Sequence, residues 1–224
     1  MTPKEIEDVV TQAIEKQVKL QSGEKWLNSK NKACLQIIKN PDCIGFDHSH
    51  QHGLDKKEPP GPKNNHGETS YRSELYKRQE RWLDEEITIG FFPCQGKKRI
   101  DLIGYEDGQF ILCELKKDGK GSSHPFDALL QVLAYYLIIR KNAKTLHDKE
   151  FYRRGTSRWQ NRGLTWLDVK KSDEENKLRL LVYAKKWSAK RATFKASKPK
   201  NDAMDEIIKG CAGKLQIDVD AEND

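Results

Sequence analysis

Two carboxylates and a lysine form a pattern that could bind a metal ion. Asp101 and Glu114 lie in two apolar, strand-like runs on either side of the pair Asp107-Gly108, a strong signal for a tight hairpin turn. Such a turn places Asp101 opposite Glu114, with Lys116 on the same face. Directly opposed side chains have Cβ atoms about 4.5–5.5 Å apart, so two like charges there favour a cation between them. We expect Mg²⁺, with Mn²⁺ able to substitute.

The alternative is that these side chains are ordinary solvated groups, with Glu114 and Lys116 forming a surface ion pair. Both faces of the hairpin are largely apolar, which favours burial of both. The apolar positions are Ile100, Leu102 and Gly104 on one face and Ile103, Tyr105, Phe110 and Leu112 on the other. Charged groups at one end of such a hairpin are therefore better explained by a functional metal site.

The composition is consistent with one domain, which could carry a small appended subdomain. The 224 residues include 41 Lys and Arg against 34 Asp and Glu, a net charge of +7 that suits a polyanionic partner such as DNA. Five cysteines without any C-x-x-C pair are typical of a reducing compartment. We see neither a signal segment nor a long apolar run, so we expect a cytoplasmic protein without a membrane span.

Hydrophobic spacing and turn residues predict helices and strands in alternation. Residues 41–70 interrupt this order with a Pro-, Gly- and His-rich segment, which we interpret as a flap beside the main site; a zinc site at Cys43, His48, His50 and His52 is the weaker alternative. The expected helices are 2–23, 70–86 (carrying Glu74 and Glu80), 125–141 and 202–211, and the expected strands are 87–92, 98–106, 109–117, 164–169, 178–185 and 214–219.

The helix that begins at Pro125 is apolar nearly all round, yet it carries Asp127, Gln131 and Tyr135 four residues apart. This spacing places the three polar side chains in one stripe. Buried Gln and Tyr side chains need hydrogen-bonding partners, so the stripe is a second candidate for a functional role.

Two basic segments could contact phosphates, and aromatic residues within them could stack on bases. A solvated basic surface is the alternative for both. The candidates for nucleic-acid binding are Arg153, Arg154, Arg158 and Arg162, with Trp159, in the loop-like stretch 142–163, and Lys185, Lys186, Lys190 and Arg191 in the stretch 185–200. The acidic C-terminal residues 218–224 are expected to be a solvated tail.

With its Asp strand, its Glu114-Leu115-Lys116 strand and its Gln131-x-x-x-Tyr135 helix, the chain resembles the PD-(D/E)XK nuclease superfamily, in particular the RecB-like branch. The resemblance covers about residues 70–185. It implies an α/β restriction-endonuclease-like fold, with an αβββαβ core and a mixed sheet flanked by helices. Residues 1–69 would be an N-terminal helical extension and flexible loop, and residues 70–224 the nuclease-like domain. Ile100 stands where the family name has Pro.

The resemblance also implies a metal-dependent hydrolysis of phosphodiester bonds, most simply in DNA during restriction, repair or mobile-element processing. Asp101, Glu114 and Glu80 would bind Mg²⁺, with Glu74 as the second choice to Glu80. Lys116 would position the attacking water or stabilise the transition state, and Gln131 and Tyr135 would orient the hairpin or contact the backbone. A catalytically silent binding module and an RNA-directed or toxin-like nuclease remain alternatives, and a homodimer or accessory partner is left open.

Overall fold

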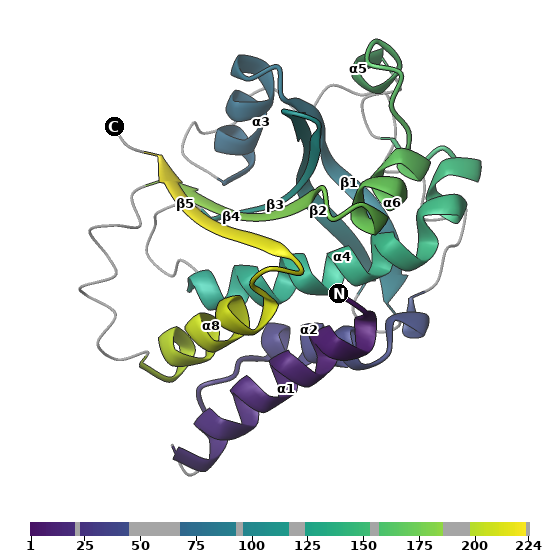
Figure 1. Ribbon diagram of the computed structural model, residues 1–224. Coiled ribbons are helices and arrows are strands. Elements are labelled where there is room, and N and C mark those ends of the chain that lie inside the picture. The colour runs from purple at the N-terminus through teal and green to yellow at the C-terminus, as the bar shows by residue number, and fades with distance from the viewer. Residues whose placement is uncertain are drawn as a thin grey trace.

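The protein has an α/β fold in which a mixed sheet is flanked by helices (Figure 1). The computed structural model describes residues 1–20, 23–44, 68–92, 96–116, 124–152, 157–185 and 198–222. The helical elements are α1 (Pro3–Leu20), α2 (Ser29–Lys39), the 3₁₀ turn η1 (Pro41–Cys43), α3 (Glu68–Arg78), α4 (Pro125–Asp148), α5 (Ser157–Gln160), α6 (Trp166–Glu174) and α8 (Lys198–Cys211). The strands are β1 (Trp82–Phe92), β2 (Gly96–Glu106), β3 (Gln109–Lys116), β4 (Leu178–Lys185) and β5 (Gln216–Glu222).

In the described part of the chain the five strands follow one another across the sheet in sequence order. β1, β2 and β3 are antiparallel, whereas β3, β4 and β5 are parallel, because α4 and α6 lie between β3 and β4 and α8 lies between β4 and β5. The predicted hairpin register is confirmed by the pairs Tyr105–Phe110 and Ile103–Leu112. Both turn residues have positive φ, 50° at Asp107 and 79° at Gly108, as a type I′ turn requires.

The alternation of side chains along β3 divides the core into two layers. Phe110 and Leu112 face the larger layer, beneath α4, while Ile111, Cys113 and Leu115 face a smaller layer with α3. Figure 1 shows α3 on one side of the sheet and α4, α8, α2 and α1 on the other. Because helices cover both faces, the hairpin is buried on both, as its composition predicts.

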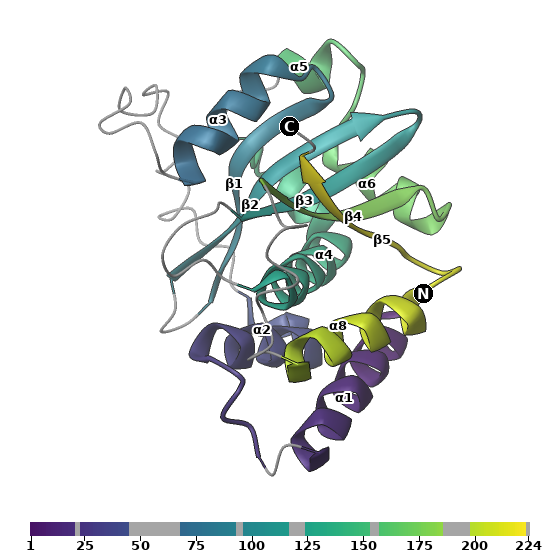
Figure 2. The same ribbon diagram turned by 90° about the vertical axis from the view of Figure 1, so that its left-hand side faces the viewer.

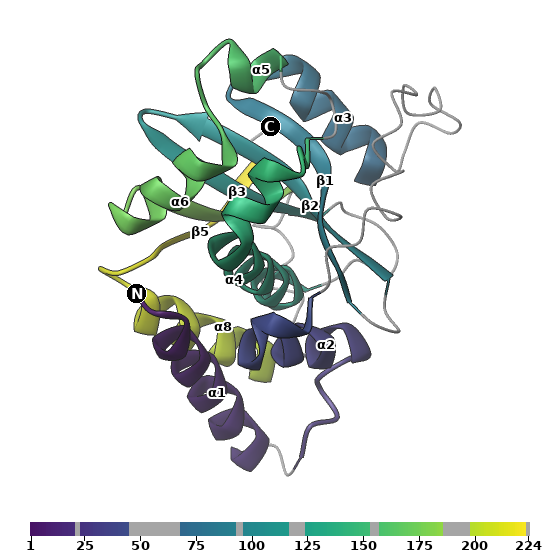
Figure 3. The ribbon, with the colours of Figure 1, turned by 90° about the vertical axis from the view of Figure 1, so that its right-hand side faces the viewer.

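The N-terminal helices belong to the main core. α1 packs against α8 and α2 against α4, and Figures 2 and 3 show the three helices α1, α2 and α8 as a layer below α4. Ile6, Val10 and Ile37 are buried with the residues of α4. The Asn31 amide, part of the capping box of α2, donates a 2.9 Å hydrogen bond to Asp127 of α4. Residues 45–67 of the predicted flap, including its four histidines, lie outside the described residues, and residues 68–70 form the start of α3.

Two of the predicted elements are wrong. The helix expected over residues 70–86 ends at Arg78, and the residues from Trp82 onwards form β1. The strand expected over 164–169 is instead the start of α6, which a capping box between Thr165 and Asp168 begins. Such a box satisfies backbone N–H groups that only a helix leaves unpaired, so local capping outweighs the apolar character of the segment.

The C-terminal half also departs from expectation. α4 extends to Asp148 and α5 follows it, so the stretch 142–163 is partly helical. Trp159 is fully buried against Phe110 and Trp166, which excludes a role in stacking on a base. Residues of the expected acidic tail form β5, which pairs with β4 as far as Glu222. Among the described helices, none is long and apolar enough to cross a membrane.

Candidate active site

The site lies where the sheet forks between β2 and β3. Their ladder of paired residues ends at Leu102 and Cys113, whereas β3 continues beside β4 until Lys116 pairs with Ala184. β2 meanwhile continues beside β1. The two strands therefore separate at Asp101, the first β2 residue beyond the last pair. A fork of this kind exposes backbone groups that need other partners.

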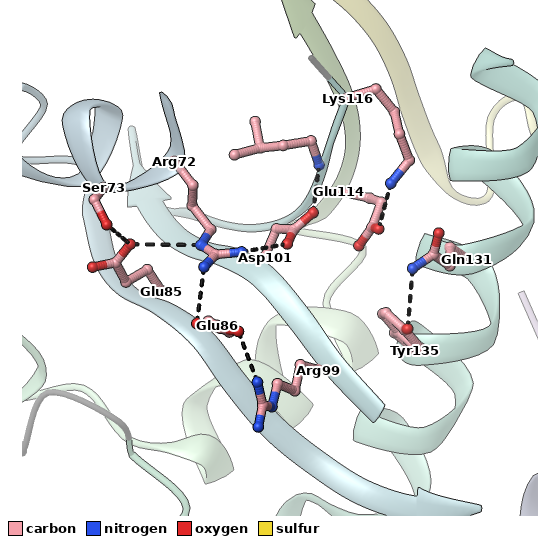
Figure 4. Close-up of polar contacts among 11 residues, drawn as sticks. Arg72, Ser73, Glu85, Glu86, Arg99, Asp101, Glu114, Lys116, Gln131 and Tyr135 are labelled. Atoms are coloured by element: carbon pink, nitrogen blue, oxygen red, sulfur yellow. Dashed lines mark hydrogen bonds and ion pairs between the residues drawn. The ribbon is translucent and has the colours of Figure 1, made fainter. Parts of the chain in front are cut away.

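The carboxylate of Asp101 fills the gap at the fork. Its Oδ2 accepts a 2.9 Å hydrogen bond from the backbone N–H of Leu115, and its Oδ1 accepts a 3.1 Å hydrogen bond from Nη1 of Arg72 (Figure 4). The side chain thus takes the place of a strand carbonyl. Turn arithmetic predicted Asp101 directly opposite Glu114; the structure instead attaches it to the next residue along β3, which still leaves the two acidic residues on adjacent strands.

Glu114 and Lys116 form a buried ion pair on the α4 side of the sheet. The Nζ of Lys116 lies 2.8 Å from Oε1 of Glu114, and the two residues are only 6% and 2% exposed. They follow Phe110 and Leu112 at alternate positions of β3, which explains why they share the face that α4 covers. The alternative of a solvated surface pair is therefore excluded for these residues.

Arg72 of α3 is a member of the site that the sequence did not indicate. Its guanidinium group contacts three carboxylates: Asp101 at 3.1 Å, Glu86 at 2.8 Å and Glu85 at 3.6 Å. Burial alone would lower the pKa of Arg72, but the three carboxylates outweigh it and raise the pKa. The Oγ of Ser73 donates a further hydrogen bond to Glu85. Neither the short polar run of α3 nor the acidic start of β1 carries a spacing that reveals this cluster.

The acidic cluster is reached from the other side by an exposed arginine. Glu86 lies opposite Asp101, between the β1 residues that pair with the neighbours of Asp101. It has a φ of 52°, a left-handed conformation that is uncommon for a residue other than glycine and that often marks functional sites. Nη1 of Arg99 lies 2.8 Å from Oε1 of Glu86, so Arg99, Glu86, Arg72 and Asp101 form a continuous chain of charges.

The structure does not bring the predicted third carboxylate to Asp101. Glu80 is exposed in the turn after α3, next to Arg81, whose carbonyl accepts a hydrogen bond from the N–H of Tyr105. Tyr105 is four residues from Asp101 along β2, and four strand residues span about 13 Å. Glu74 is also exposed and pairs within its own helix. The acidic residues that do share a partner with Asp101 come from β1.

α4 brings two predicted polar residues to the site. The Nε2 of Gln131 donates a 3.1 Å hydrogen bond to the hydroxyl of Tyr135 (Figure 4). Burial, with the charge of Glu114 as a further cause, raises the pKa of Tyr135 well above its usual value, so the hydroxyl keeps its proton. Asp127, the third member of the stripe, has a structural role because it accepts from Asn31 and from the backbone of His124.

The two carboxylates at the fork are oxygen donors of the type that a hard cation takes. Mg²⁺ is commonly bound by one or two carboxylates, with water and substrate oxygens in its remaining positions. Asp101 and Glu114 supply two, and the hydrogen bonds to Asp101 use only part of its capacity to accept. Arg72 competes for the same carboxylate. Within the described residues, no group of three or more His, Cys, Asp or Glu side chains is placed to hold a metal ion, so a full protein cage does not form there.

Arg158 and Arg162, the two described arginines among those predicted to bind nucleic acid, both donate hydrogen bonds to the protein. Nη1 of Arg158 donates to the carbonyls of Tyr76 and Trp82, and its guanidinium lies 3.9 Å from the centre of the Tyr76 ring. Arg162 donates to two backbone carbonyls near the hairpin turn. Lys185 ends β4, and the side chain of Lys185 and the residues Arg153, Arg154, Lys186, Lys190 and Arg191 lie outside the described part.

Comparison of the chain with protein-family models, with curated proteins and with solved structures finds no match. The likeness to the PD-(D/E)XK superfamily therefore remains a prediction from the motif residues alone.

Proposed function

We propose that the protein is a metal-dependent nuclease that hydrolyses phosphodiester bonds, with DNA as its substrate. The observation that carries the proposal is the fork itself, where Asp101 is hydrogen-bonded to the backbone between Glu114 and Lys116. A buried lysine beside two buried carboxylates is costly to desolvate, and a purely structural role does not call for such a set. The net charge of +7 suits a polyanionic substrate.

Each residue of the fork has a role in this chemistry. Asp101 and Glu114 would hold Mg²⁺ or Mn²⁺, which lowers the pKa of a bound water and offsets charge on the phosphate. The ammonium of Lys116 would orient the attacking water or a phosphate oxygen, because Glu114 fixes its position at 2.8 Å. The protonated hydroxyl of Tyr135 and the amide of Gln131 would donate hydrogen bonds to the substrate backbone or hold the hairpin in place.

The arrangement of elements supports the finer fold assignment within the same proposal. α3, the three antiparallel strands, α4 and the parallel strand β4 occur in the αβββαβ order of a restriction-endonuclease-like core. The Asp strand and the Glu-x-Lys strand are its second and third strands, and the Gln-x-x-x-Tyr helix follows them. Glu80 and Glu74 have no role in the proposed site.

The test is a cleavage assay on linear, circular, single-stranded and branched DNA, and on RNA, with Mg²⁺ or Mn²⁺. The variants Asp101→Asn, Glu114→Gln and Lys116→Met should each lower the cleavage rate at least about 100-fold, since metal and charge stabilisation supply several kcal/mol and each 1.36 kcal/mol is a factor of ten. Glu106→Gln is the matched control, because Glu106 lies at the other end of the same hairpin, paired with Arg81.

Circular dichroism and thermal unfolding must show that each variant is folded. Cleavage by the control but not by the three site variants would support the proposal. Wild-type protein that cuts none of these substrates with either metal, or site variants that keep the wild-type rate, would refute it. Cleavage of RNA alone would leave the site assignment standing and replace the substrate.

A catalytically silent nucleic-acid-binding module is the second candidate. The ion pair between Arg72 and Asp101 favours it, because a buried guanidinium already supplies the positive charge that a metal would bring. Metal-independent DNA binding by a protein that cleaves nothing would establish this alternative.

A further inference from the structure

A cavity of about 430 Å³ lies beside the proposed active site, between α2, β2 and α4. Ala33, Cys34 and Ile37 of α2 form an apolar wall, and the ring of Tyr135 from α4 contributes to the lining. The volume is within the range of about 300–1,000 Å³ that is typical of pockets for small organic ligands. The N-terminal extension therefore forms part of a pocket that also includes a predicted site residue.

The charged residues among the described lining of the same cavity are both lysines. Lys98 of β2 and Lys30 of α2 line it, together with the hydroxyl of Ser29 and the amide of Gln131, and none of the described residues that line it is Asp or Glu. Burial lowers the pKa of Lys98, which marks its ammonium as partly withdrawn from water. Ser29 and Lys30 also lie in the first turn of α2, where the helix dipole favours anions. The apolar wall is suited to the base and sugar of a nucleotide, and the two lysines are suited to its phosphate.

The cavity shares two residues with the proposed active site. Gln131 and Tyr135 line the cavity, the amide of Gln131 donates a hydrogen bond to the hydroxyl of Tyr135, and the charge of Glu114 helps to raise the pKa of Tyr135. Burial raises the pKa of Cys34 in the α2 wall to about 12, with the charge of Glu114 as the next cause. A strand whose phosphate is at Lys116 could place the adjoining nucleotide in this cavity.

We propose that the cavity between α2, β2 and α4 binds one unpaired nucleotide of the substrate strand, with its phosphate toward Lys98 and Lys30. An apolar wall suits a base that has left the stack, and a space of this size has no room for a base pair. The inference rests on the proposed nuclease function for the identity of the strand. It makes α2 a substrate-binding element and gives the enzyme a requirement for a single-stranded or opened site.

The test measures the binding of deoxythymidine 5′-monophosphate and of inorganic phosphate to the full chain in EDTA, by titration calorimetry and by NMR shifts. Lys98→Gln and Lys30→Gln should each weaken nucleotide binding about tenfold, because each removes one charge-assisted hydrogen bond. Lys170→Gln is the matched control, since it removes the same charge from an exposed position on α6. Lys30 is exposed as well, so its variant tests the proposal even if Lys98→Gln fails to fold.

Nucleotide binding at least about tenfold tighter than phosphate binding, weakened by both cavity variants and not by the control, would support the proposal. Equal affinity for phosphate and nucleotide, or affinity unchanged in both cavity variants, would overturn it. The measurement needs neither metal nor cleavage, so the two proposals fail separately. An inactive protein that still binds the nucleotide through Lys98 refutes the nuclease, whereas an active enzyme without this binding refutes the pocket.

Discussion

Arg72→Met should lower the free energy of unfolding strongly. Methionine keeps a long unbranched chain but removes the cation that contacts Asp101, Glu85 and Glu86. Arg72 is 5% exposed, so water cannot replace the guanidinium without opening the core. Removing one partner from a buried ion-pair network costs about 3–5 kcal/mol. That is a large share of a total free energy of unfolding of about 5–15 kcal/mol.

Urea unfolding followed by circular dichroism measures this loss. With a slope of about 3 kcal/mol/M, the upper end for small proteins, the urea midpoint should fall by about 1–1.7 M. Arg99→Met is the matched control, because Arg99 also pairs with Glu86 but its side chain is 41% exposed. An exposed pair contributes about 0–1 kcal/mol, so the control should shift the midpoint by about 0.3 M or less.

The same experiment also tests the competition between Arg72 and a metal. Added Mg²⁺ stabilises a protein that binds it only when folded, so it should raise the midpoint more for Arg72→Met than for the wild type. Adding Asp101→Asn to Arg72→Met should restore part of the stability, because one uncompensated charge is removed. An Arg72→Met midpoint within about 0.3 M of the wild type would show that the network is not needed, and the reasoning would be wrong.

Two further predictions concern residues away from the fork. Arg158→Ala should lower the free energy of unfolding by about 1–3 kcal/mol, because the guanidinium of Arg158 donates hydrogen bonds to the carbonyls of Tyr76 and Trp82. The same variant should leave the salt dependence of DNA binding unchanged. A salt slope reduced by about one would show that Arg158 contacts a DNA phosphate. Burial, with the charge of Lys200 as the next cause, lowers the pKa of His124 from 6.5 to about 4. Between these two pH values the unfolded state binds a proton that the folded state does not. The free energy of unfolding should therefore fall as the pH falls from about 6.5 toward 4. His124→Asn keeps a cap for α4 and should weaken this dependence, measured as unfolding midpoints at several pH values; an unchanged dependence would contradict the assignment.

The sequence was sufficient to predict the hairpin, its turn and the strand face on which its charged residues lie. Asp107 and Gly108 tolerate the positive φ that a type I′ turn requires, and the period of two then assigns Glu114 and Lys116 to one face. The stripe of Gln131 and Tyr135 likewise follows from helical spacing. These are short-range consequences of backbone sterics, which is why they can be predicted without a tertiary structure.

Only the tertiary structure shows the fork between β2 and β3, the position of Arg72 at the fork and the cavity beside it. Asp101 reaches Leu115 because β2 follows β1 while β3 follows β4, and no local pattern encodes that divergence. Arg72 meets Asp101 across 29 residues of chain, and α2 forms a wall of the cavity because it packs on α4. Two residues show the opposite case. Glu80 is of a type that binds metals, but it is exposed in the turn after α3, away from Asp101. Trp159 is of a type that stacks on bases, but it is buried in the core. The sequence by itself determined which groups could do the chemistry, and the tertiary structure decided which of them meet, because contacts between distant segments depend on how whole layers pack.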